Sequence, residues 1–242
     1  MYFPYFDYTY VVYVLPAVLL SIWASVMVKS RFARYSKVAS RRNMTGAQAA
    51  ELLLRAAGIT DVRVTHISGE LTDNYNPSTK TLNLSSSTYS SSSIAAIGVA
   101  AHETGHAVQH KCGYGPLALR SSLVPAANLG SQAGPVLVIA GIILGGMAKS
   151  QQVFSICNIL TDIGVVLFGL SVLFYLVTLP VEFNASSRAL KMLRSMDVLD
   201  NEELNGVRKV LSAAAMTYVA SALVAIGNLI RLIILSDRNS RR

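Results

Sequence analysis

The chain contains long apolar runs, which predict helices that cross a membrane. A hydrocarbon core about 30 Å thick requires roughly 20 consecutive, mostly apolar residues in a helix. Four stretches approach this length: residues 10–28, 126–148, 159–179 and 213–235. In the second stretch, the apolar character is clearest from residue 135 onward. About half of all residues are apolar, and charged residues are few. We therefore expect a mostly α integral membrane protein with about four transmembrane helices.

A different pattern follows the first span and predicts a small α+β unit. Thr45 and Gln48 have the spacing of a capping box at a helix start, and Gly58 supplies the stop. Alternating residues over 62–66 and 81–84 predict strands, and Asn74 to Pro77 predicts a turn between them. The strand over 81–84 is a candidate wall of a substrate cleft, because an extended peptide can add to an open sheet edge.

A serine-rich stretch, Ser85 to Ser93, separates these strands from an apolar run over 94–101. Serine is a favoured residue at the start of a helix because its hydroxyl accepts a hydrogen bond from an otherwise unpaired backbone N–H. We expect a loop here, with its last serines capping a helix that includes the apolar run.

That helix carries His102, Glu103 and His106 in an H-E-x-x-H pattern. Residues four apart lie on one face of a helix, so the two imidazoles can bind one zinc ion. Glu103 lies beside them and is the candidate general base for a zinc-activated water. The motif is short and arises by chance in other helices, but two histidines and a glutamate in an apolar helix are costly to bury without such a partner.

A catalytic zinc site needs a third protein ligand and an open position. His110 lies eight residues from His102, about 12 Å along the helix axis, too far to share its ion. Cys112 has the spacing of the third metzincin ligand, but Gln109 stands where that motif has glycine. Glu182 follows two further spans and returns to the same side of the membrane as His106, in a polar segment that we expect to begin a new helix after Pro180. It is the preferred candidate.

Charge sets the expected orientation. The chain has a net charge of +8, and six of its basic residues crowd the segment just after the first span: Lys29, Arg31, Arg34, Lys37, Arg41 and Arg42. The positive-inside bias then places this segment, and the candidate active site, on the cytoplasmic face of the cell membrane. Basic residues beside a span contact anionic lipid, so we expect no nucleic-acid partner. Cys112 and Cys157 offer no disulfide framework.

These patterns divide the chain into five expected segments. An N-terminal transmembrane anchor (1–28) precedes a zincin-like unit with the motif helix (29–125). Two transmembrane helices (126–180) lead to the segment with Glu182 (181–212). A last transmembrane helix and a basic tail complete the chain (213–242).

Several blocks of the sequence are similar to the bacterial membrane-bound neutral zinc metallopeptidases called YugP-like. They are Gly69 to Pro77, Lys80 to Ser85, Ile94 to Gln109, Arg120 to Pro125, Leu179 to Arg188 and Ala213 to Leu235. The chain more remotely resembles the HtpX-type gluzincins, whose third zinc ligand is the glutamate of an E-x-x-A-D pattern. Here Glu182 and Ala185 match that pattern, but Ser186 replaces its aspartate.

The resemblance implies a zinc endopeptidase with one zinc ion per chain. His102, His106 and Glu182 would be its ligands and Glu103 its base, and the substrates would be proteins or peptides, membrane-associated ones included. An acidic residue is frequent in the family where Asn184 and Asn76 stand, so the surroundings of this site would be less charged. Arg188, Tyr75, Tyr89, Tyr114 and His66 are candidate donors to a developing oxyanion, and nothing in the sequence chooses among them.

Two alternatives remain open at this stage. A site-2-type intramembrane protease would use Asp162, the one carboxylate near the start of the third span, as third ligand. A non-catalytic membrane scaffold would retain the metal site as a vestige, and Glu103 would then be dispensable.

Overall fold

The computed structural model describes residues 8–240 and contains eleven elements. Residues 1–7 of the expected N-terminal anchor and the basic residues Arg241 and Arg242 lie outside the described residues. The elements in chain order are a π-helical turn η1 (Tyr10–Val14), α1 (Leu15–Tyr35), α2 (Gly46–Ala56), β1 (Arg63–Ile67), β2 (Asn74–Asn76), β3 (Thr81–Ser85), α3 (Ser86–Tyr89), α4 (Ile94–Lys111), α5 (Gly115–Met147), α6 (Gln151–Ser195) and α7 (Asn201–Ser240).

The chain forms two compact units. The helical unit comprises Met1–Trp23, Leu119–Thr178 and Tyr218–Arg242, and the α+β unit comprises Ala24–Ala118 and Leu179–Thr217. The helices that contain α1, α5, α6 and α7 are long and apolar enough to cross a membrane, which confirms the four expected spans. The protein is a mostly α membrane protein with a small α+β unit.

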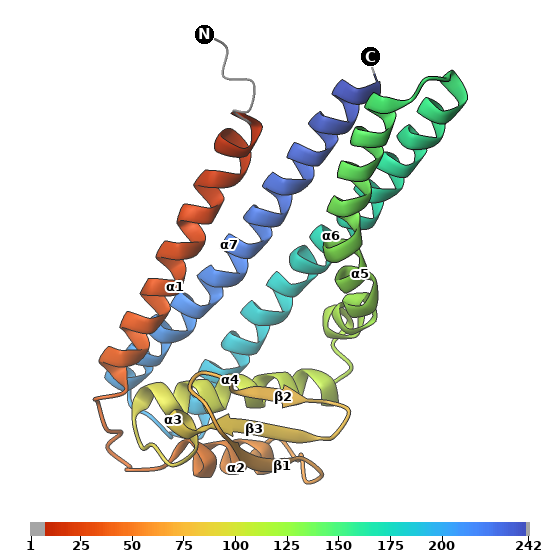
Figure 1. Ribbon diagram of the computed structural model, residues 1–242. Helices are drawn as coiled ribbons and strands as arrows, with labels where there is room; N and C mark the ends of the chain where they lie inside the picture. The colour runs from red at the N-terminus through yellow and green to blue at the C-terminus, as the bar shows by residue number, and fades with distance from the viewer. Residues whose placement is uncertain (1–7, 241–242) are drawn as a thin grey trace. The chain divides into compact units, whose positions relative to one another are not determined.

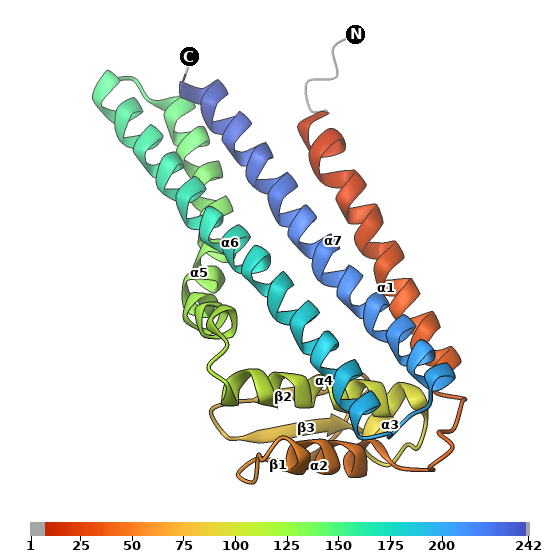
Figure 2. The ribbon, with the colours of Figure 1, turned by 180° about the vertical axis from the view of Figure 1, so that it is seen from behind.

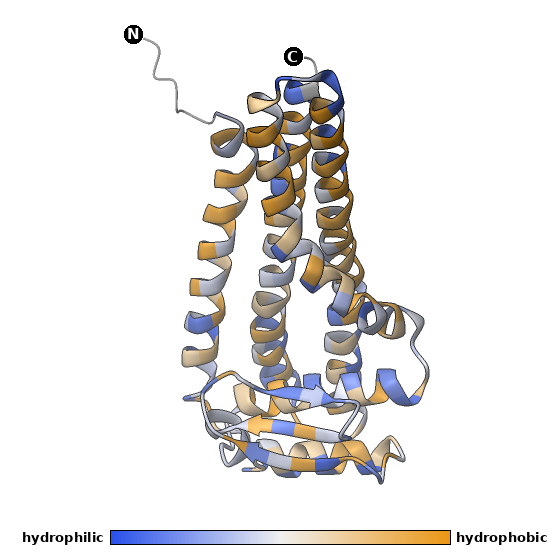
Figure 3. Ribbon diagram, turned by 45° about the vertical axis from the view of Figure 1, so that its right-hand side comes forward, coloured by the Kyte–Doolittle hydropathy of each residue, from blue (hydrophilic) through white to orange (hydrophobic). Residues whose placement is uncertain are grey.

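Within the helical unit, α5 and α6 pack closely through small residues. A Cβ atom added at Gly134 would lie 2.9 Å from the carbonyl oxygen of Gly164, so the two backbones are in contact there. The Ser171 hydroxyl on α6 donates to the Ala127 carbonyl at 2.8 Å, which satisfies a polar side chain inside an apolar bundle. Large apolar side chains such as Ile143 and Val166 remain exposed on these helices, and hydrophobic residues make up much of the long helices (Figure 3). Such a surface suits contact with lipid.

The α+β unit is built on a three-stranded sheet with the order β1-β3-β2 (Figure 1). β1 is parallel to β3, and β2 is antiparallel to it. The Asn74–Asn76 segment, expected to be a turn, is a strand because its backbone pairs with β3. β3 is the central strand, so the expectation that it offers an open edge is wrong. β1 and β2 are the edge strands.

The helix-capping residues expected from the sequence cap their helices in this unit. Thr45 and Gln48 form both hydrogen bonds of the capping box at the start of α2, and Gly58 has a φ of 65° just after its end. The Ser93 hydroxyl accepts a hydrogen bond from the Ala96 N–H and caps α4. The serine-rich stretch is not a simple loop, however, because four of its residues form the short helix α3.

α4 is buried on two sides, which fixes the helix that carries the H-E-x-x-H motif. On one side, Leu82 and Leu84 of β3 pack with Ala100 and Ala107 of α4, and α2 completes this core. On the other, α4 packs against the end of α6 and the start of α7 through a second cluster: Ile94, Ile97, Ala101, Ala189, Leu193, Val207 and Leu211. The short motif helix is therefore held by packing as well as by its cap.

α6 differs from expectation near Pro180. We expected a new helix to begin there, but α6 continues without a break from Gln151 to Ser195 and contains Pro180 in its interior (Figure 2). Glu182 consequently lies in the middle of a helix and not in its first turn. A helix tolerates proline where neighbouring groups satisfy the carbonyl that loses its partner.

Candidate metal centre

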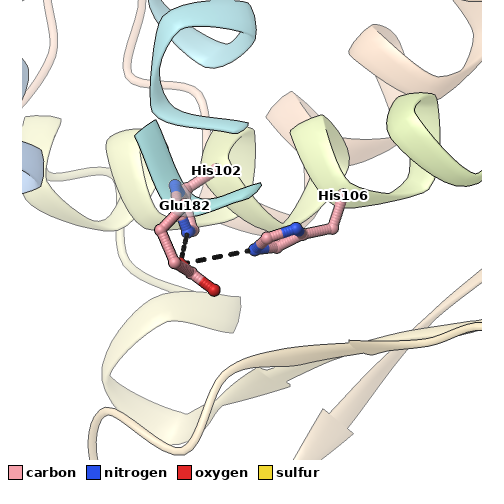
Figure 4. A group of neighbouring side chains, drawn as sticks. All are labelled: His102, His106 and Glu182. Atoms are coloured by element: carbon pink, nitrogen blue, oxygen red, sulfur yellow. Dashed lines mark hydrogen bonds and ion pairs between the residues drawn. The ribbon is translucent and has the colours of Figure 1, made fainter. Parts of the chain in front are cut away.

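Three potential metal ligands converge between α4 and α6. His102 and His106 extend from one face of α4, and Glu182 extends from α6 toward both imidazoles (Figure 4). The Glu182 Oε2 atom lies 3.2 Å from His102 Nε2 and 3.6 Å from His106 Nε2. One ligand atom from each residue lies within 4.8 Å of the others. All three side chains are shielded, and Glu182 most of all, with 3% of its side chain exposed.

Gly105 explains how α6 comes close enough to bring Glu182 to the histidines. A Cβ atom added at Gly105 would lie 2.6 Å from the backbone carbonyl oxygen of Ala185, nearer than real Cβ atoms approach. Ala185 is itself fully buried. The glycine inside the H-E-x-x-H motif therefore permits direct backbone contact between the two helices that carry the three side chains.

Each imidazole has a second polar contact, on its Nδ1 atom. The Ser186 hydroxyl lies 3.1 Å from His102 Nδ1. The Gln109 Oε1 atom lies 2.9 Å from His106 Nδ1. Contacts of this kind orient the ring and set which nitrogen is available to a metal.

Sequence reasoning missed the role of Gln109. Its position three residues after His106 places it on the same helical face, which was the available signal. Its other partners are distant in the chain: its amide nitrogen donates to the Val181 carbonyl at 2.8 Å and to Asn184 Oδ1 at 3.0 Å. No pattern in the sequence indicates those contacts.

The electrostatics of the cluster favour a positive charge between its members. Burial lowers the pKa of His106, but the hydrogen bond to Glu182 and the nearby negative charge of Glu103 outweigh it and raise the pKa above its ordinary value of 6.5. Glu103 is itself buried on α4. In the absence of a metal cation, a proton on His106 would supply this positive charge.

The other candidates are not part of this cluster. His110 Nδ1 lies 2.8 Å from the Tyr75 hydroxyl, and the exposed Cys112 thiol donates to the Gln109 carbonyl. Asp162 belongs to the helical unit, where its carboxylate accepts a hydrogen bond from Ser236. The cluster of His102, His106 and Glu182 has three potential ligands without it.

Several of the candidate oxyanion donors contact residues of the α+β unit other than the three potential ligands. Arg188 donates to Asn184 and stacks over the ring of Tyr114, with 5.9 Å from its guanidinium carbon to the ring centroid. His66 contacts the Ser86 hydroxyl at 3.0 Å and the edge of the Tyr89 ring. Tyr75 pairs with His110.

A family model described as "Putative neutral zinc metallopeptidase" matches residues 10–237 of the chain. The chain belongs to this family. It is also 45% identical over 216 residues to the "Putative membrane protease YugP" of Bacillus subtilis, which covers 89% of this chain and 91% of the relative. The match over residues 10–237 includes the four candidate spans, the motif helix and Glu182, so it covers residues of both units. No solved structure matches the chain.

Proposed function

We propose that the protein is a membrane-embedded zinc endopeptidase of the gluzincin type. The observation that carries this proposal is the convergence of His102 and His106 of α4 with Glu182 of α6, 80 residues after His102, in a chain of a zinc metallopeptidase family. The proposal assigns these three residues as ligands of one zinc ion and Glu103 as the general base.

The donor set fits zinc. Two imidazole nitrogens and a carboxylate oxygen are borderline ligands that zinc accepts readily, and three protein ligands leave a fourth position for water or substrate. Donor atoms around a tetrahedral zinc ion are separated by about 3.4 Å. The separations of 3.2 Å and 3.6 Å from Glu182 Oε2 to the two Nε2 atoms are close to this value.

The roles of the side chains follow from their chemistry. Bound zinc would polarise a peptide carbonyl and lower the pKa of water toward neutrality. Glu103 would accept the proton that the attacking water loses and pass it to the leaving amine. His102 and His106 would hold their orientations through the contacts with Ser186 and Gln109, so little reorganisation would be needed during the reaction.

We infer a protein or peptide substrate at the membrane surface. The four apolar helices confine the protein to a lipid bilayer, and the relative in Bacillus subtilis is described as a membrane protease. The edge strand β2 packs on α4 and has one side without a partner strand in the described sheet, so an extended peptide could align along it. The basic residues after the first span support an active site on the cytoplasmic face.

A hydrolysis assay tests this function. Detergent-purified protein should cleave an unfolded protein such as casein, lose activity to a zinc chelator and regain it with zinc. The Glu103→Gln variant should retain zinc but lose at least about a hundredfold in rate, because the base is gone and the ligands remain. Equal activity of Glu103→Gln and wild type would contradict the proposal and favour a contaminating protease. A metal-loaded wild type with no activity on any peptide or protein substrate would favour the scaffold alternative.

A further inference from the structure

Four polar side chains form a continuous line of hydrogen bonds that ends at His106. Arg188 Nε donates to Asn184 Oδ1 at 2.7 Å, and Gln109 Nε2 donates to the same oxygen at 3.0 Å. Gln109 Oε1 then lies 2.9 Å from His106 Nδ1. Gln109 is fully buried and His106 is nearly so, so the bond between them is shielded from exchange with water, and the two bonds to Asn184 are partly buried.

The direction of each bond follows from groups that have only one role. A guanidinium can only donate, so the Asn184 atom that faces Arg188 must be its carbonyl oxygen. That oxygen and the backbone carbonyl of Val181, at 2.8 Å, can only accept. The Gln109 group between these two acceptors must therefore be its NH₂, and the orientation of its amide is fixed.

The same reasoning fixes the tautomer of His106. With its NH₂ turned toward α6, Gln109 presents its carbonyl oxygen to His106 Nδ1, and this oxygen can only accept. Nδ1 must therefore carry a proton, and a neutral His106 presents the Nε2 lone pair toward Glu182. A lone pair 3.6 Å from a carboxylate oxygen is favourable only with a cation between them.

His102 lacks this constraint. Its Nδ1 atom contacts the Ser186 hydroxyl, which can donate or accept. The two histidines of the motif therefore differ: the tautomer of His106 is set by its surroundings, and the contact of His102 with Ser186 permits either.

We propose that Arg188, Asn184 and Gln109 are positioning residues that hold His106 in the Nδ1-protonated tautomer before a metal arrives. This inference rests on the proposed function, because it takes His106 Nε2 as a ligand atom. This arrangement of hydrogen bonds depends on the acceptor oxygen of Asn184. Without it, only the Val181 carbonyl holds the Gln109 NH₂ toward α6, so the amide can turn over more readily and present its NH₂ to His106, which would favour the wrong tautomer.

Two variants at Asn184 separate polarity from packing. Asn184→Asp keeps an acceptor for Arg188 and Gln109, and Asn184→Leu has the same branched shape with four side-chain heavy atoms but no acceptor. Full-length protein with ¹⁵N-labelled histidine in detergent micelles allows the tautomer to be measured by NMR without metal, at the alkaline end of a pH series where the ¹⁵N shifts of His106 no longer change and its ring is neutral. Zinc affinity is then measured by competition with a chelator. Lys191→Gln, at an exposed position on α6, is the control.

We expect wild type, Asn184→Asp and Lys191→Gln to show the Nδ1-protonated form of His106. Asn184→Leu should show a mixture and bind zinc about tenfold or more weakly, with Asn184→Asp within about threefold of wild type. Equal tautomer populations in the Leu and Asp variants would overturn the inference, as would an Nε2-protonated His106 in wild type. The tautomer is read without metal, so a wild type that binds no zinc refutes the proposed function and still leaves this inference decided by the spectrum.

Discussion

Each imidazole of the candidate metal centre has a different partner on its Nδ1 atom, and this difference is the main chemical feature at the scale of single residues. His106 contacts a buried amide, and His102 contacts a hydroxyl. An uncharged partner strengthens a ligating imidazole less than a carboxylate does. Zinc affinity should therefore depend on both contacts, although neither places a charged group on an Nδ1 atom.

Removal of the Ser186 hydroxyl tests the partner of His102. The Ser186→Ala variant should bind zinc about tenfold more weakly, because the ring loses the contact that orients it. Chelator competition measures the affinity, and Ser187→Ala, at the exposed neighbouring position, is the matched control. An unchanged affinity in Ser186→Ala would show that this contact has no influence on the ligand.

The raised pKa of His106 predicts opposite effects of pH on the metal-free and zinc-bound protein. In the folded metal-free protein, the contact with Glu182 contributes its full stability below the ordinary histidine pKa of 6.5, and this contribution is lost as the pH rises through the raised value. Zinc requires the neutral ring, so protons compete with it over the same range.

The increase in melting temperature caused by zinc should consequently grow as the pH rises from about 6 to about 9. Thermal unfolding in detergent, with and without zinc, measures this difference. An increase that is greatest at the acidic end would contradict the assignment of His106 as a ligand.

At the scale of elements, the contact between α4 and α6 determines whether Glu182 reaches the histidines. Gly105→Ala places a methyl group against the Ala185 carbonyl oxygen, so the helices must separate. We expect a loss of about 1–3 kcal/mol in unfolding free energy and a clear loss of bound zinc. Thermal unfolding and metal analysis measure both. Gly115→Ala is the control, because a Cβ atom there meets nothing within 4 Å. Wild-type zinc content in Gly105→Ala would refute the role of this close contact.

The elements also show which parts of the fold can be predicted from sequence. The spans, the α2 capping box and the Ser93 cap depend on local composition and spacing, and they are predicted correctly. β2 is missed because asparagine and proline favour turns, whereas pairing with β3 decides its conformation. The end of α6 is misplaced for a similar reason: Pro180 disfavours a helix locally, but the packed segment beyond it sustains one.

The residues of the candidate metal centre divide in the same way. His102, Glu103 and His106 are identified by spacing on one helix, and Glu182 by counting membrane spans together with the family resemblance. Gln109 is not identified, because its partners Val181 and Asn184 are more than 70 residues away in the chain. Only the folded arrangement brings them together.

At the scale of the whole molecule, the basic residues after the first span predict a cytoplasmic α+β unit. The exposed thiol of Cys112, in that unit, is a natural probe. A membrane-impermeant maleimide should label it in permeabilised cells and leave it unlabelled in intact cells. Cys112→Ser, which retains the buried Cys157, is the control for background. Labelling of Cys112 in intact cells would place the candidate active site on the outer face.

The zinc content of purified protein tests the central claim most directly. Wild type and Asp162→Ala should each contain about one zinc ion per chain by plasma emission spectroscopy, and Glu182→Ala should contain little, because Glu182 completes the cluster with the two histidines among residues 8–240. Loss of zinc in Asp162→Ala with retention in Glu182→Ala would contradict the account and favour an intramembrane site. A metal-replete wild type without zinc would refute the assignment of a zinc centre altogether.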